Sequence, residues 1–96
     1  MEDGVNVIKG FIMENKKLEL LDKLFYCQNG KELVNVALEN AEYLNELLKD
    51  NSNNRGYVLS DYELILGELD SFPVKNEEED WAIDTLNLFL QIISNE

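Results

Sequence analysis

The chain has 96 residues, with 20 Asp or Glu against eight Lys or Arg and no His, which gives a formal net charge of −12. This length predicts a single domain, residues 1–96, and a hydrophobic content of 45% is too high for a disordered acidic tail. The absence of histidine excludes imidazole-based triads, proton shuttles and zinc sites. The charge argues strongly against nucleic acid or an anionic membrane as a partner, because both would repel it.

The cysteine content and the N-terminus bear on the compartment. Cys27 is the one cysteine, so no intramolecular disulfide is expected, and its apolar neighbourhood predicts a buried small side chain. Residues 1–4 lack the basic region of a signal peptide, and no apolar run approaches the length that spans a membrane. We therefore expect a cytoplasmic protein.

Two helices are predicted in the N-terminal third, one capped by Asp3 and one capped by Asn15. The first would carry Val5, Ile8, Phe11 and Ile12, and the second Leu18, Leu21, Leu24 and Phe25. Gly10 and the β-branched residues weaken the first assignment, and a short strand at residues 5–8 is the alternative.

Three capping boxes predict the starts of three further helices. Each places a capping side chain three residues before a glutamate: Asn29 before Glu32, Ser60 before Glu63, and Asn76 before Glu79. In such a box the side-chain oxygen of the cap residue accepts a hydrogen bond from the backbone N–H of the glutamate. The glutamate carboxylate in turn accepts a hydrogen bond from the backbone N–H of the cap residue.

The first box predicts one helix from Lys31 to Lys49. Its apolar face recurs at intervals of three and four residues and consists of Val34, Ala37, Leu38, Ala41, Leu44 and Leu48. The polar stretch 50–56 predicts a loop, and residues 57–59 are a candidate for a short extended piece.

The second box predicts a helix with the apolar face Tyr62, Ile65, Leu66, Leu69 and Phe72. Pro73 disfavours helical backbone in the residue before it, so we expect the helix to end near Ser71 or Phe72. Gly67 costs about 1 kcal/mol relative to alanine, and we expect it to let another helix approach closely.

The third box predicts a helix over Glu77–Ser94. Its first turn holds four acids, where the helix dipole favours negative charge, and its polar residues Asp84, Asn87, Gln91 and Ser94 form one narrow stripe. A helix that is apolar around most of its circumference is either central in the bundle or pairs with a partner. The chain as a whole predicts an all-α fold, a compact bundle of four to five short helices.

The loop after Asp50 resembles a calcium-binding EF-hand loop only in part. Asp50, Ser52 and Asn54 would supply the first oxygen ligands, but Arg55 stands where glycine is needed and Asp61 where a bidentate glutamate is needed. We therefore expect no metal and no cofactor, and a degenerate calcium-binding adaptor remains an alternative. No glycine-rich phosphate loop is present, and the acids lie at helix starts and on polar faces, so an enzyme is not expected.

The charge is unevenly distributed along the chain. Residues 1–55 hold ten acids and seven bases, whereas residues 56–96 hold ten acids and only Lys75. One interpretation is a solvated surface that keeps the protein soluble, with some acids serving as helix caps. The other is a patch complementary to a basic protein surface. Tyr57 is the better interface anchor, since Tyr62 lies on an apolar face, and Trp81 fits either role.

Small, histidine-free, strongly acidic helical domains of this kind resemble bacterial immunity proteins, which inhibit colicin-type and contact-dependent growth-inhibition nuclease toxins. The resemblance covers size, charge and helix content and involves no diagnostic motif. It implies tight binding to a basic toxin nuclease domain, with Tyr57 as the anchor and with acids that pair with toxin Lys and Arg: Asp61, Glu63, Glu68, Asp70, Glu77, Glu78, Asp80 and Asp84. A phage-encoded nucleic-acid mimic that inhibits a host defence nuclease is a sibling interpretation. The apolar helix from Trp81 to Ile93 also allows a weak homodimer in place of a monomer.

Overall fold

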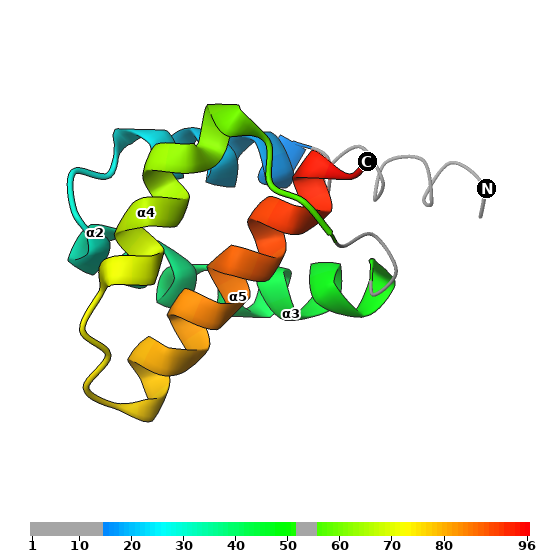
Figure 1. Cartoon of the computed structure of the whole chain (residues 1–96). Helices are drawn as coiled ribbons and strands as arrows, with labels where there is room; N and C mark the ends of the chain where they lie inside the picture. The colour runs from blue at the N-terminus through cyan, green and yellow to red at the C-terminus, as the bar shows by residue number, and fades with distance from the viewer. Residues whose placement is uncertain (1–14, 52–55) are drawn as a thin grey trace.

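A computed structural model describes residues 15–51 and 56–96. Every regular element in these ranges is helical, and they contain no strand. Residues 15–26 are helical and are called the N-terminal helix below. The other elements, in chain order, are α2 (Gly30–Glu39), α3 (Ala41–Asp50), the 3₁₀ turn η1 (Ser60–Tyr62), α4 (Glu63–Ser71) and α5 (Glu77–Ser94). The predicted all-α bundle of short helices is confirmed (Figure 1).

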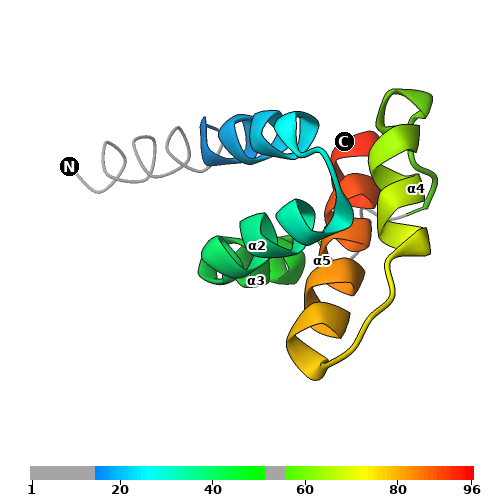
Figure 2. The same cartoon turned by 90° about the vertical axis from the view of Figure 1, so that its left-hand side faces the viewer.

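α5 is the central helix of the bundle, and its bounds are those predicted. It packs against α2, α3 and α4, with α2 and α3 on one side and α4 on the other (Figure 2). The side chains on its inner face are fully buried, among them Ala82, Leu86, Phe89 and Leu90. Burial of each large apolar side chain contributes about 1.5–3 kcal/mol, so α5 organises the core.

Asparagine caps begin α2 and α5, as predicted. The Asn29 side chain accepts the Glu32 amide at 3.0 Å, and the Asn76 side chain accepts the Glu79 amide at 2.8 Å. The return bonds differ from the predicted box. The Glu32 carboxylate accepts a hydrogen bond from the backbone N–H of Gln28, and the Glu79 carboxylate accepts one from the backbone N–H of Lys75. Each carboxylate therefore bonds to the residue before the cap and not to the cap itself.

The prediction of one helix over Lys31–Lys49 was wrong, because the chain breaks at Asn40 into α2 and α3. The Asn40 side chain donates to the Val36 carbonyl at 2.8 Å, and its backbone leaves the helical region at φ −116° and ψ 24°. Asparagine competes in this way with the helical hydrogen-bond ladder. The break also changes the inner face. Leu38 is exposed, and the buried residues are Leu33, Val34, Ala37, Tyr43, Leu44 and Leu47.

α4 ends at Ser71, as Pro73 predicted, but its start differs from the prediction. The chain enters through η1, in which the Tyr62 amide donates to the Leu59 carbonyl at 3.0 Å. Ser60 therefore lies inside the 3₁₀ turn, and no side chain caps either element. Residues 57–59 form no strand, although the Leu59 backbone is extended.

Gly67 does not serve as a close contact between helices, contrary to the prediction. A Cβ atom added there would meet no atom of the described residues within 4 Å, because the residue faces outward. The close contact is at Gly30 instead, where a Cβ would lie 2.5 Å from the Phe72 ring. The end of α4 thus packs on the first residue of α2.

The N-terminal helix buries a different face from the one predicted. Leu20 and Leu24 are buried, whereas Leu18 is 62% exposed and Phe25 is 51% exposed. Lys17 shares the inner face, and its ammonium group pairs with the Glu96 carboxylate, so a charged residue obscured the apolar pattern. Asn15 is itself helical and so is not the cap. The predictions for Asp3, for the helix it would cap and for the alternative strand at residues 5–8 lie outside the described residues.

Candidate functional site

The predicted partner-binding acids are all exposed. They are Asp61, Glu63, Glu68, Asp70, Glu77, Glu78, Asp80 and Asp84. Glu79 is the exception within this stretch, because it is buried, it accepts the amide of residue 75, and it pairs with Lys31 at 3.7 Å. Among the described residues, Glu79 is the one acid of residues 61–84 that has an ion pair. The eight exposed acids therefore have no ion-pair partner in the part of the chain that the structure describes.

Helical periodicity separates the acids of η1 and α4 into two pairs on opposite flanks. Ile65 and Leu69 define the buried side of α4. Asp61 and Glu68, seven residues apart, lie on one flank, and Glu63 with Asp70, also seven apart, lies on the other. The structure thus does not gather the four acids into one patch.

Asp61 and Glu68 line a groove between the N-terminal helix and α4, which is called the α4 groove below. Its volume is about 290 Å³. Its lining residues come from the N-terminal helix and the turn after it, from α2, and from η1 with α4: Leu24, Phe25, Cys27, Gln28, Leu33, Asp61, Leu64, Ile65 and Glu68. The groove therefore combines an apolar lining with an acidic rim.

Sequence reasoning missed the two apolar side chains that make this groove distinctive. Leu64 is 88% exposed, and Phe25, which lines the same groove, is half exposed. The Phe25 ring lies 5.8 Å from the Tyr62 ring, centroid to centroid, at an interplanar angle of 39°. A signal for Leu64 was present, because this leucine falls outside the predicted apolar face of its helix. Phe25 carried no such signal, since it is one of the apolar residues expected on its own helix.

A second groove of about 300 Å³ lies where the bend between α2 and α3 meets the start of α5, and it is called the Trp81 groove below. Leu38, Ala41, Asn45, Glu77, Glu78 and Trp81 line it. Trp81 is half-buried there, so it serves both the core and this surface. Asp80 and Asp84 are exposed on the same helix.

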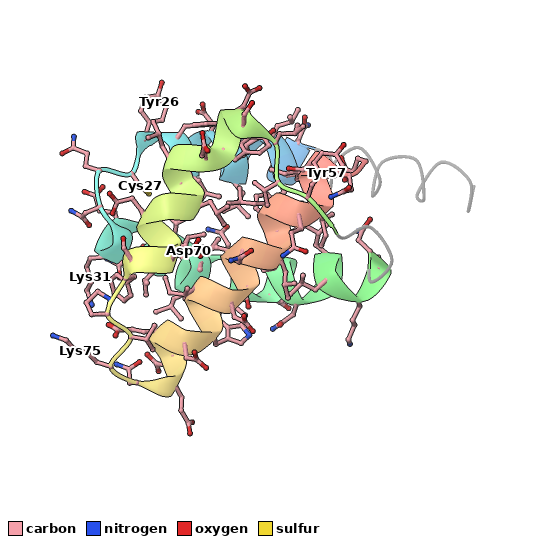
Figure 3. All side chains as sticks on the ribbon, viewed as in Figure 1. Tyr26, Cys27, Lys31, Tyr57, Asp70 and Lys75 are labelled. Carbon is pink, nitrogen blue, oxygen red and sulfur yellow. The ribbon has the colours of Figure 1, made fainter. Side chains whose placement is uncertain are left out.

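Tyr57 lies far from the acids of the first turn of α5. It is 61% exposed, and its carbonyl accepts the Asn95 side-chain amide at 2.8 Å. Figure 3 shows Tyr57 near the C-terminal end of α5 and Lys75 beyond its N-terminal end. With 18 residues, α5 separates its two ends by roughly 27 Å. Tyr57 and Glu77 thus lie at opposite ends of α5.

The environment of Cys27 disfavours ionisation of its thiol. Partial burial, with a smaller effect from the Glu32 carboxylate, raises the pKa of Cys27 above its ordinary value. The thiol donates to the Lys23 carbonyl at 3.3 Å. Since the thiolate is the nucleophilic form, Cys27 acts here as a half-buried packing residue.

In residues 15–51 and 56–96, no three His, Cys, Asp or Glu side chains gather closely enough to hold a metal ion. The loop that was compared with an EF-hand lies partly outside these ranges, which do not include Ser52, Asn54 or Arg55. None of the described helices has both the length and the apolar character needed to cross a membrane.

Comparisons with known proteins add no family assignment. No protein-family model, no curated protein and no solved structure matches the chain. The acids and grooves described above are therefore the features of the molecule that bear on its function.

Proposed function

We propose that this protein is a non-catalytic acidic protein that neutralises a basic protein partner, and that it acts as an immunity protein inhibiting a cognate nuclease toxin. A nuclease domain needs a positively charged surface to hold its nucleic acid. An acidic protein that covers such a surface competes with the nucleic acid for it. The size, the helix content and the net charge of −12 support this assignment.

One observation carries the proposal: eight exposed acids between residues 61 and 84 lack an ion pair with any described residue. Residues 56–96 contain a single cation, Lys75. Uncompensated acids of this kind steer a basic partner toward the surface and favour it over acidic ones. Apolar side chains in the α4 groove and the Trp81 groove would add the desolvated contacts that affinity requires.

The test is co-expression with the product of the gene directly upstream, the expected position of a toxin gene relative to its immunity gene. Bacteria that express the upstream product alone should stop growing, and co-expression of this protein should restore growth. The purified pair should form a stoichiometric complex whose association rate falls steeply between low and high salt. Full growth arrest despite co-expression, with no complex in size-exclusion chromatography, would refute the proposal.

Charge reversal gives a matched comparison within the same assay. The triple variant Glu78→Lys, Asp80→Lys and Asp84→Lys should slow association, because it reverses exposed acids on α5. The control triple Glu39→Lys, Glu42→Lys and Glu46→Lys makes the same change in net charge on exposed positions of α2 and α3. If both triples slow association equally, the partner responds to total charge and the acids of α5 are not its contact surface.

A further inference from the structure

The α4 groove brings together two exposed apolar side chains from helices that are distant in the sequence. Single exposed hydrophobic residues are ordinary. Here Leu64, at 88% the most exposed large hydrophobic side chain of the described residues, lines the same groove as the half-exposed Phe25. Leu64 contributes little to the core from this position, so its contribution to stability does not account for a leucine there.

The rim of the groove matches the spacing of charges on a helix. Asp61 and Glu68 both line the groove and have no ion pair with a described residue. They are seven residues apart, which places them roughly 10 Å apart along the helix direction. A partner helix with Lys or Arg at positions i and i+7 would present two cations at the same spacing.

We propose that the α4 groove is the docking site for a basic amphipathic helical segment of the partner. The apolar side chains of this helical segment contact Phe25 and Leu64, and the cations of the segment pair with Asp61 and Glu68. This inference rests on the proposed function, because it takes the partner to be a basic protein. A second copy of this chain is a poorer occupant, since two molecules of net charge −12 repel each other.

The Trp81 groove is a weaker candidate for the same role. It also has acids at its rim, Glu77 and Glu78, but Trp81 is half-buried and already packs against the core. No apolar side chain that lines it is as exposed as Leu64. The amide and indole N–H signals of Trp81 therefore serve as an internal reference for binding elsewhere.

The experiment is an NMR titration of the isotope-labelled full chain with two synthetic peptides. One is a 14-residue peptide with Leu at helical spacing and Lys at the remaining positions, and the other is an oligolysine of equal charge. We expect the Leu/Lys peptide to shift the amide signals of Phe25, Leu64 and Glu68 more than those of Trp81. Leu64→Ser should weaken its binding by about tenfold or more, as for an interface hot spot, and should leave oligolysine binding unchanged.

Two charge-reversed pairs give a matched control. One pair combines Asp61→Lys with Glu68→Lys, and the other combines Glu63→Lys with Asp70→Lys. The two pairs change the net charge equally, keep the same seven-residue spacing, and act on opposite flanks of α4. The first pair should weaken peptide binding much more than the second. Thermal unfolding of both pairs checks that the fold is retained.

Three results would overturn the inference: equal weakening by the two pairs, signal shifts centred on Trp81, or a dimer in sedimentation that Leu64→Ser abolishes. The growth assay separates this inference from the proposed function. Rescue that persists in Leu64→Ser refutes the groove assignment and leaves the immunity function standing. Failure of the wild-type protein to rescue growth refutes the immunity function, while the peptide titration still decides the groove.

Discussion

α5 and α4 are neighbouring helices that differ in how much of their surface the core covers. Eight of the 18 residues of α5 are buried, against two of the nine residues of α4, Ile65 and Leu69. α5 begins with an asparagine cap, whereas no side chain caps α4. α4 instead exposes Leu64, Gly67 and its acids to solvent. The comparison indicates that α5 maintains the fold and that α4 presents a surface.

The largest expected effect comes from emptying the centre of α5. Phe89→Ala should lower the free energy of unfolding by about 3–5 kcal/mol, because it leaves a cavity at a fully buried site. The matched truncation on α4, Leu64→Ala, should change it by less than about 0.5 kcal/mol, as for exposed positions generally. Urea denaturation followed by circular dichroism measures both. A large loss for Leu64→Ala would mean that this side chain stabilises the fold, which would contradict the role assigned to α4.

The second effect tests how the end of α4 is attached to α2. Gly30→Ala should destabilise the protein by about 1–3 kcal/mol, because its Cβ would overlap the Phe72 ring. The penalty should shrink in a Phe72→Ala background, where the ring is absent. A double-mutant cycle in urea provides the measurement, and an unchanged penalty would show that the ring is not its cause.

The third effect compares the two helix starts. Asn76→Ala should lower stability by about 1 kcal/mol, the usual loss on removing an N-cap, since Asn76 accepts the Glu79 amide. Ser60→Ala is the matched control and should be nearly neutral, because no side chain caps η1 or α4. Thermal unfolding checks both variants, and equal losses would argue that Ser60 does act as a cap.

The smallest expected effect is a gain. Gly67→Ala should raise stability by about 0.5–1 kcal/mol, since alanine has the higher helix propensity and the added Cβ meets none of the described residues. Chemical denaturation of this variant and of the wild type measures the difference in their free energies of unfolding. A loss of stability would indicate that something packs closely on Gly67.

Local interactions made much of the fold predictable. The asparagine caps at Asn29 and Asn76, the stop before Pro73 and the apolar periodicity of α5 all act between residues a few positions apart. Leu64 was partly predictable as a surface residue, since it lies off the apolar face of its helix. The acids were predictable as a group, and helical periodicity about the predicted apolar face already divides those of α4 between two flanks. Only the tertiary structure shows that one of these flanks lines a groove together with Phe25.

The amino-acid sequence by itself determined the helical class, the bounds of α5 and the acidic character of residues 56–96, because propensity, capping and composition are local properties. The tertiary structure decided which face of the N-terminal helix turns inward, since Leu20 and Leu24 are buried in the core and Lys17 pairs with Glu96. It also decided that Gly30, and not Gly67, lies at a close contact, and that Phe25 and Leu64 line one groove. These features depend on contacts between residues distant along the chain, which no local pattern encodes.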